Sequence, residues 1–301
     1  MTTPAAALRS FALAILALLS QAVHADVKLN SSRALVVDEA TGQVLLEKNS
    51  QDIVPMASLT KLLTAMVVLD AQQSPDELIT IETSDLDTLK NTRGGVPVGK
   101  SYSREALIER ALLTSDNHAA SSLARHYPGG LVAFLDAARL KAEALQLTST
   151  TLVEPTGLSP QNRSSAADLV AVLAAAATYP DIARITSQAQ IRKQDGGRIQ
   201  TLKNTNQLVG KKGWEILLSK TGFTNEAGRC VAMRLRSAGH TVLVVLLDAP
   251  ASRGRTLDAV NVHRIVAGDT PLLTLPHEAR TPAAKGLIKS ARRKKVAPNS
   301  A

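Results

Sequence analysis

Segments with the pattern of β-strands lie near both ends of the chain, and helix-like segments fill the middle. Apolar runs on the two sides of a turn predict a hairpin over residues 33–47. Three more strands are expected at residues 214–222, 229–236 and 240–248, with a tight turn at 237–239. Strands linked by hairpins pair antiparallel. This order therefore predicts a single sheet built from both ends of the chain, with a helical insertion between them.

The first helical pattern covers residues 55–66, where a proline opens an almost continuous apolar run. Further helices are expected over residues 104–127, interrupted by "LLTSDNH", and over residues 131–145. Residues 166–177 predict another helix, and residues 260–266 belong to a closing one. The predicted layout is thus strands, a long helical middle, then strands and a final helix.

The first 25 residues have the order of an export signal. Arg9 is their only charge, residues 11–19 form an apolar core, and "VHA" at 23–25 is a small-x-small cleavage site. The apolar core is shorter than a membrane span, which needs about 20 residues. We therefore expect residues 1–25 to be a signal peptide and the mature protein to be periplasmic. A buried N-terminal helix is the alternative.

The formal charge of +9 is concentrated near the C-terminal end. Residues 277–301 hold seven lysines and arginines and one glutamate, so the rest of the chain is close to neutral. We expect residues 271–301 to form a disordered basic tail. The tail either solubilises the protein or makes weak contact with an anionic membrane or cell-wall polymer. The body has no basic stripe with interleaved aromatic residues, so nucleic acid is not an expected partner.

One cysteine, Cys230, is available for redox or metal chemistry, and it cannot form an internal disulfide. It lies in an apolar run, which favours a buried structural thiol. We therefore expect no metal and no cofactor. Between the predicted signal peptide and the basic tail, the histidines are His118, His126, His240 and His263, and they lack the spacing of metal ligands.

A polar pair interrupts the apolar run "PMASLTKLLTAM" at residues 55–66. Ser58 and Lys61 are three residues apart, so they share one face of a helix. A serine becomes a nucleophile when a base removes its proton, and burial or a second cation lowers the pKa of a lysine. The pair is therefore a candidate nucleophile and base. Alone it is weak evidence, because a lysine snorkelling beside a serine at a helix start gives the same pattern.

Two further motifs strengthen this interpretation. "SDN" at residues 115–117 offers a hydroxyl and a carboxamide at a break in a helical stretch, although such residues also favour helix caps. "KTG" at residues 220–222 follows the apolar strand "WEILLS". Gly222 would allow a substrate backbone to approach closely. Lys220 would bind a carboxylate and lower the pKa of Lys61, unless it is an ordinary solvated lysine at a strand end.

The motifs S-x-x-K, S-x-N and K-T-G occur here in this order, on a helix, a helix break and a strand. Penicillin-binding proteins and class A β-lactamases share this set. Longer stretches resemble the low-molecular-weight penicillin-binding proteins, which are serine DD-peptidases. These stretches are "PMASLTKLLTAMVVLDAQ", "LLTSDNHAASSLARHYPGG", "VEPTGLSPQN", "NTNQLV" and "LSKTGFTNEAGRCVAM". The resemblance covers roughly residues 30–270 and does not reach the basic tail.

The resemblance implies an α+β fold of the β-lactamase/transpeptidase type. Its parts would be a five-stranded antiparallel sheet flanked by helices and an all-helical subdomain, roughly residues 80–165, within a peptidase domain of residues 26–270. It also implies that the partners are the stem peptides of peptidoglycan, and that β-lactam antibiotics are covalent inhibitors.

The family's residue roles carry over to the matching positions. Ser58 resembles the acylated nucleophile, Lys61 its base and Ser115 the proton relay. The backbone N–H groups of Ser58 and Phe223 resemble an oxyanion hole. The implied site is therefore Ser58, Lys61 and Ser115 for catalysis, and Asn117, Lys220, Thr221, Gly222 and Phe223 for substrate binding.

Several activities fit this site. We expect a DD-endopeptidase that cuts D-alanyl cross-links, with a DD-carboxypeptidase that removes terminal D-alanine as the alternative. Many such carboxypeptidases have an extra C-terminal β-domain, and the residues after 270 are too few for one, which favours the endopeptidase. Class A β-lactamases place a glutamate two residues before a Leu-Asn pair, and Glu154 in "EPTGLS" does not match that spacing. A non-catalytic cell-wall binding protein is the remaining alternative.

Overall fold

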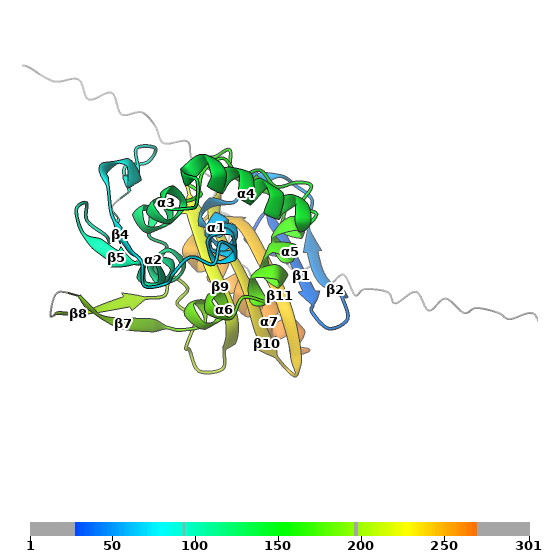
Figure 1. Cartoon of the computed structure of the whole chain (residues 1–301). Coiled ribbons are helices and arrows are strands. Elements are labelled where there is room, and N and C mark those ends of the chain that lie inside the picture. Colours follow the sequence, from blue (N-terminus) through cyan, green and yellow to red (C-terminus); the bar gives the residue numbers. More distant parts are fainter. Residues whose placement is uncertain (1–27, 93, 196–197, 270–301) are drawn as a thin grey trace, which may run out of the picture.

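A five-stranded antiparallel sheet forms the centre of the molecule (Figure 1), in a computed structural model that describes residues 28–92, 94–195 and 198–269. The strand order is β2-β1-β11-β10-β9, so both ends of the chain contribute, as predicted. Strand β9 lies at one edge of the sheet. The strands are β1 (Arg33–Asp38), β2 (Val44–Lys48), β9 (Glu215–Thr224), β10 (Gly228–Ser237) and β11 (His240–Ala249).

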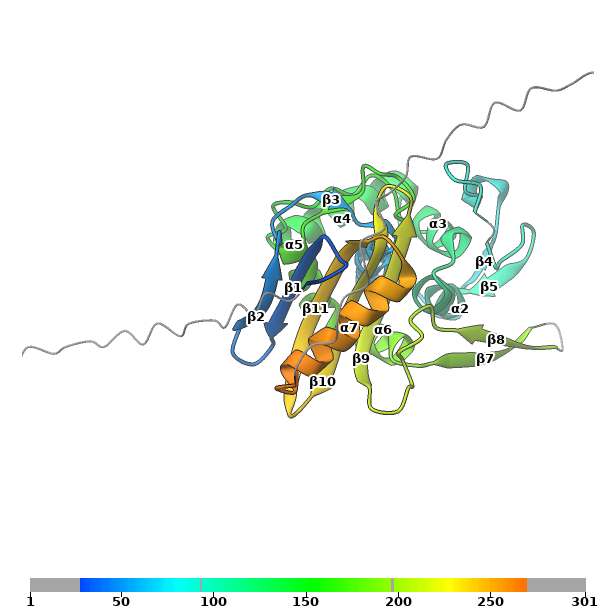
Figure 2. The same cartoon turned by 180° about the vertical axis from the view of Figure 1, so that it is seen from behind.

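Helices cover the sheet on both faces, which explains the continuous apolar runs of its inner strands. Successive side chains of a strand point to opposite faces. In β11, Leu243 and Val245 pack into one apolar cluster with the interior helices. Val242 and Val244 pack into a second cluster with α7 (Ser252–Val266). Figure 2 shows α7 lying across the face formed by β10 and β11.

Helix α1 (Thr60–Asp70) runs through the interior and packs against α4 (Gly130–Ala144) and α5 (Ala166–Ala177) (Figure 1). Its residues from Thr60 to Val68 are all buried, and Lys61 is one of them. Burial of each large aliphatic side chain stabilises the fold by about 1.5–3 kcal/mol. A buried charge, by contrast, is costly unless neighbouring groups satisfy it. Lys61 therefore needs polar partners in the interior, and these partners belong to the candidate site.

The helical middle of the chain has the predicted break. The helical stretch expected over residues 104–127 is divided by a π-helical turn, η3, after which Ser115 adopts left-handed backbone angles with φ 62°. Helix α5 has the same bounds as the prediction. The helices are α2 (Arg104–Glu109), η3 (Arg110–Thr114), α3 (Asn117–Arg125), α4 (Gly130–Ala144), α5 (Ala166–Ala177) and α6 (Pro180–Thr186).

Several short elements were not predicted. Strands β7 (Gln190–Asp195) and β8 (Arg198–Lys203) form a hairpin whose sequence is mostly polar. Its buried side chains include Ile191 and Leu202, too few for a recognisable alternation. The other short elements are β3 (Val54–Pro55), η1 (Ala57–Leu59), β4 (Leu78–Thr80), η2 (Thr83–Asp85), β5 (Ser101–Ser103) and β6 (Arg163–Ser164).

The predicted signal peptide, residues 1–25, and the predicted basic tail, residues 271–301, lie outside the described residues. The boundaries of the helical subdomain, residues 80–165, stay a prediction. Within the described part of the chain, no single helix is long and apolar enough to cross a membrane. Only α5 and α6 taken together reach that length and composition, and they meet at a bend of 103°.

A loop at Gly157 supports the start of α1, and it requires glycine. Gly157 has φ +84°, and a Cβ there would lie 1.9 Å from the carbonyl oxygen of Ala57. We expect Gly157→Ala to lower the free energy of unfolding by about 2–4 kcal/mol, from left-handed backbone strain and overpacking together. Gly42 is a matched control, because it has φ +71° with nothing within 4 Å. Urea unfolding should show a loss of only about 1–2 kcal/mol for Gly42→Ala, and equal losses would contradict the argument.

Candidate active site

Ser58 lies in the short 3-10 turn η1, directly before α1, and is half-buried. The preceding residue, Ala57, has left-handed backbone angles with φ 47°, a conformation that is uncommon for a residue with a side chain. Strand β9 passes close to this turn at Gly222. A Cβ at that position would lie 3.1 Å from the backbone nitrogen of Ser58. Gly222 thus brings the backbone of β9 beside the Ser58 N–H, where the oxyanion hole was expected, although that role stays a prediction.

The Lys61 amine is buried and surrounded by three oxygen atoms. Its Nζ lies 3.2 Å from Ser58 Oγ, 2.7 Å from Asn117 Oδ1 and 2.7 Å from the Thr156 carbonyl oxygen. The last two oxygens are acceptors only. In a neutral amine they take the two N–H groups, and the remaining lone pair faces the Ser58 hydroxyl. This arrangement suits Lys61 to remove the Ser58 proton.

Burial lowers the pKa of Lys61 from its ordinary value of 10.5 to about 8. The negative charges of Glu154, Asp116 and Asp87 oppose this effect, which keeps the pKa from falling further. With that pKa, about one tenth of the amine is neutral at pH 7. A useful fraction of the protein therefore has Lys61 in the form that can act as a base.

The S-x-N motif gives both a helix cap and two groups in the cavity. Asp116 caps α3, since its Oδ1 accepts a hydrogen bond of 3.0 Å from the Ala119 N–H. Its neighbours Ser115 and Asn117 line the cavity. The Asn117 side chain donates to Thr92 Oγ1 at 2.7 Å. Because its carbonyl end accepts from Lys61, the orientation of the carboxamide is fixed at both ends.

Lys220 reaches from the sheet to the helical side of the site. Its Nζ is buried and donates to Ser115 Oγ at 2.8 Å and to the Thr221 carbonyl at 3.0 Å. Burial lowers its pKa well below the ordinary value, and the positive charges of Lys61 and Arg255 lower it further. A carboxylate bound at Lys220 would stabilise its ammonium form. The repulsion between the two lysines would then favour the free base at Lys61.

A cavity of about 1010 Å³ opens over these groups. The structure brings the predicted site residues together around this cavity. Lys61 and Lys220 do not line it directly, but each contacts a residue that does: Lys61 contacts Ser58 and Lys220 contacts Ser115. The predicted residues that line the cavity directly are Ser58, Ser115, Asn117, Thr221, Gly222 and Phe223.

Sequence reasoning missed several polar partners of the predicted residues. Thr205 accepts a hydrogen bond of 2.7 Å from the Thr221 hydroxyl, and Thr92 and Thr156 contact Asn117 and Lys61. Two of them lie in stretches that were already noted, "NTNQLV" and "VEPTGLSPQN". These threonines contact the site residues only because the chain folds, so no local sequence pattern shows whether the side chain or the carbonyl makes the contact.

Glu154 does not face the cavity, because its carboxylate is occupied within its own loop. The two oxygens accept from the backbone N–H groups of Thr156 at 2.7 Å and Gly157 at 2.6 Å. The Asn162 side chain donates to the same carboxylate at 3.0 Å. Glu154 therefore fixes the loop that presents the Thr156 carbonyl to Lys61.

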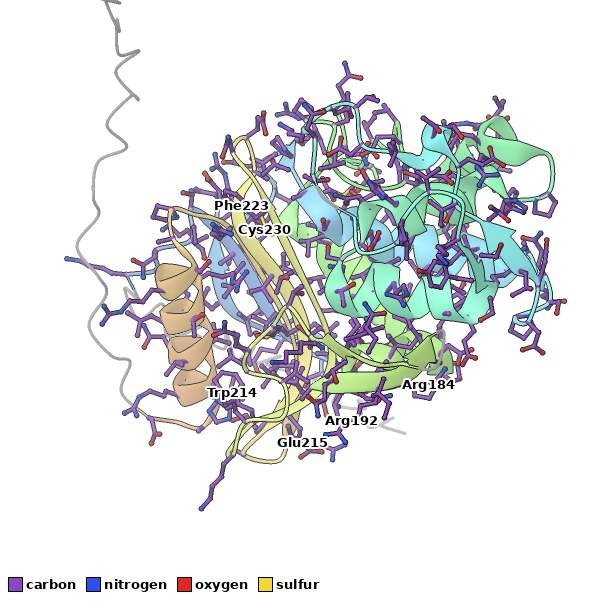
Figure 3. All side chains as sticks on the ribbon, turned by 90° about the vertical axis from the view of Figure 1, so that its left-hand side faces the viewer. Arg184, Arg192, Trp214, Glu215, Phe223 and Cys230 are labelled. Carbon is purple, nitrogen blue, oxygen red and sulfur yellow. The ribbon has the colours of Figure 1, made fainter. Side chains whose placement is uncertain are left out.

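Cys230 and His118 have structural surroundings. Burial raises the pKa of the Cys230 thiol to about 11, so it stays protonated at neutral pH. Figure 3 shows Cys230 near the β9–β10 turn. The ring of His118 is buried, with Nδ1 3.2 Å from the Val96 carbonyl. Trp214 packs against the ring of His263 at 4.8 Å between centroids, at the other end of the sheet.

Comparison with known proteins decides the family. Residues 20–251 match the model of the peptidase S11 family, D-alanyl-D-alanine carboxypeptidase. The chain belongs to this family. A D-alanyl-D-alanine endopeptidase of Pseudomonas aeruginosa is 42% identical over 239 residues, which is 79% of this chain and 77% of that protein. Another, of Escherichia coli, is 40% identical over 224 residues, 74% of this chain and 72% of that protein.

Two solved structures share the fold. The D-alanyl-D-alanine carboxypeptidase of Mycobacterium tuberculosis has a TM-score of 0.72 at 26% identity, over 82% of this chain and 95% of that one. The DD-transpeptidase of Streptomyces K15 has a TM-score of 0.73 at 24% identity, over 79% of this chain and 97% of that one, a likeness in fold. The α+β fold that the sequence resemblance implied is thereby confirmed.

The lowered pKa of Lys61 predicts how acylation depends on pH. Below pH 8 the amine is mostly protonated and cannot accept the Ser58 proton. We therefore expect the second-order rate constant for acylation by a fluorescent penicillin to rise with pH, by about tenfold from pH 6 to 7, and to level off above pH 8. Stopped-flow measurements between pH 6 and 9 test this. A flat profile in that range would contradict a titrating base.

Replacement of Lys61 tests whether its neutral form is what matters. We expect Lys61→Met to lower the acylation rate by about 10²–10⁴-fold, the usual contribution of a general base. Lys61→Arg keeps the positive charge but cannot lose its proton in a protein, so it should be equally slow. Circular dichroism checks that both variants fold. Fast acylation of the arginine variant would mean that Lys61 acts only through its charge.

Proposed function

We propose that this protein is a DD-endopeptidase that cuts D-alanyl cross-links between the stem peptides of peptidoglycan, through an acyl-enzyme at Ser58. The observation that carries this proposal is the position of the buried Lys61 amine, which lies 3.2 Å from the Ser58 hydroxyl. Its other two partners, Asn117 Oδ1 and the Thr156 carbonyl oxygen, can only accept hydrogen bonds. That geometry supports nucleophilic acyl transfer rather than simple binding.

In the acylation step, Lys61 removes the Ser58 proton as Oγ attacks the carbonyl carbon of the D-alanine. Negative charge develops on the carbonyl oxygen, and backbone N–H groups at Ser58 and Phe223 are the proposed donors to it. The peptide chain of the substrate lies along the free edge of β9, as an added strand. Asn117 then donates to or accepts from the substrate amide.

The amine leaves once it has gained a proton. Ser115 is hydrogen-bonded to Lys220, so its hydroxyl can pass a proton to the departing nitrogen. The proton that Lys61 took from Ser58 then replaces it on Ser115, which returns Lys61 to the free base. Lys220 and Thr221 hold the carboxylate beside that nitrogen. Water then attacks the acyl-enzyme, with Lys61 again as the base, and releases the D-alanyl product.

Two observations bear on the choice between endopeptidase and carboxypeptidase. Relatives that are 42% and 40% identical are D-alanyl-D-alanine endopeptidases, which supports the first. The matching family model is described as D-alanyl-D-alanine carboxypeptidase, so removal of a terminal D-alanine is the second candidate. Both reactions use the same acyl-enzyme and differ only in the leaving amine.

Rapid hydrolysis of β-lactams is not part of the proposal. Class A β-lactamases add a glutamate to the lysine as a base for the deacylating water. The Glu154 carboxylate does not offer that base, because it is engaged in its own loop. We therefore propose that β-lactams form a long-lived acyl-enzyme at Ser58 and act as inhibitors.

We also propose a location and a role for the chain ends. Residues 1–25 would export the protein to the periplasm, where its substrate lies, and cleavage would leave Asp26 first. The basic residues after 277 would make weak contact with an anionic membrane or with the wall. N-terminal sequencing of the protein from a periplasmic extract tests the first proposal, and sedimentation with anionic vesicles tests the second.

Cross-linked muropeptide dimers test the proposed activity. The purified protein should convert the dimer to monomers, as followed by liquid chromatography and mass spectrometry. Ser58→Ala should abolish this conversion and also covalent labelling by a fluorescent penicillin. Loss of only the terminal D-alanine from pentapeptides would favour the carboxypeptidase, whereas labelling without any cleavage would favour a wall-binding protein.

A further inference from the structure

The cavity continues past the catalytic groups to a second wall on α7. Strand alternation explains this: Gly222 faces the turn at Ser58, so Thr221 and Phe223 point to the opposite face of the sheet. Helix α7 packs on that face, beside β10. The cavity therefore runs from Ser58 around the free edge of β9 to the first turns of α7.

This second wall is strongly basic. Arg229 on β10 and Arg253 and Arg255 on α7 all line the cavity. Within the described ranges, no carboxylate forms an ion pair with any of the three. The charges are close enough to affect one another, since burial lowers the pKa of Arg255 and the positive charge of Arg229 lowers it further. Such a set of unmatched charges favours an anion in the cavity.

Arg229 is held in place while its hydrogen-bond donors stay available. It pairs across the strands with Phe223, and its guanidinium carbon lies 3.4 Å from the centre of that ring. Stacking on an aromatic face fixes the guanidinium plane and leaves its N–H edge free to bind a carboxylate. No described residue accepts a hydrogen bond from Arg229. Arg255, in contrast, donates to the Cys230 carbonyl at 3.3 Å.

The two candidate leaving groups differ in the charge that they have away from the scissile bond. A terminal D-alanine has one carboxylate, directly beside the scissile bond, where Lys220 and Thr221 are expected to hold it. The departing stem peptide of a cross-link is longer, and it has further carboxylates away from that bond. A carboxylate that reaches past Thr221 to the arginines beside α7 can therefore come only from the longer leaving group.

We propose that Arg229 and Arg253 hold a second carboxylate of the departing stem peptide, and so make the site select cross-linked peptides over short ones. This inference rests on the proposed DD-peptidase function and assigns the residues that would choose between its two forms. Phe223, 45% exposed at the cavity, serves as the platform on which Arg229 is oriented.

The test compares kcat/KM for a cross-linked dimer and for an uncross-linked pentapeptide that ends in D-Ala-D-Ala. We expect Arg229→Gln to lower the value for the dimer about tenfold, the loss of one charge-assisted hydrogen-bonded pair. The pentapeptide value and the rate of penicillin acylation should change less than twofold. Arg229→Lys should retain part of the preference for the dimer. Arg253→Ala should reduce this preference, and the fold should be unaffected because Arg253 is exposed.

Arg192→Ala is the charge-matched control. Arg192 is exposed on β7, and Figure 3 shows it far from Phe223, toward the other end of the sheet. It should leave all three rates unchanged. In addition, a second dimer keeps the carboxylate beside the scissile bond but has the more distant free carboxylates of its departing stem converted to amides. It should be a poor substrate for the wild type, and Arg229→Gln should lower its cleavage no further.

The outcomes separate this inference from the proposed function. If the wild type cleaves the dimer but Arg229→Gln and Arg253→Ala lose no preference, the inference is wrong and the function stands. Equal losses on dimer, pentapeptide and penicillin would show that Arg229 only supports the fold, which also overturns it. If the wild type cleaves no dimer at all, both proposals fail.

Discussion

The buried amine of Lys61 is the interaction on which the rest of the site depends. An ammonium or amine with no contact to water must be satisfied by protein atoms. Its partners come from three places: Ser58 one turn earlier, Asn117 on α3, and the carbonyl of Thr156 in a loop. Because all three must meet one nitrogen, the packing of α1 against the helical middle and against that loop is fixed together with the chemistry.

The helical part of the chain supplies the candidate catalytic groups and strand β9 supplies candidate binding groups. The two sets meet through a second buried lysine. Lys220 on β9 donates to Ser115, which follows the π-helical turn. The positive charge of Lys61 lowers the pKa of Lys220, so the protonation states of the two amines are coupled.

Much of the fold could be predicted, since it follows from local patterns. The strands at both ends and helix α5 agree closely with expectation because each is an apolar run bounded by turn or capping residues. The hairpin β7–β8 and helix α6 were missed. The first is largely polar, and the second is a short helix begun by Pro180, directly after α5. The start of α1 also differs from the prediction, which began the helix at residue 55. A 3-10 turn that contains the left-handed Ala57 comes first, and α1 begins at Thr60.

The sequence by itself determined the candidate members of the site, because S-x-x-K, S-x-N and K-T-G are local spacings that a helix, a helix break and a strand convert into geometry. Only the tertiary structure decided which atoms they meet. Lys220 and Ser115 are 105 residues apart in the chain, and Lys61 and Thr156 are 95 apart. The stack of Arg229 on Phe223 depends on strand register. Such contacts are set by the packing of distant elements, which leaves no period or spacing in the sequence to show them.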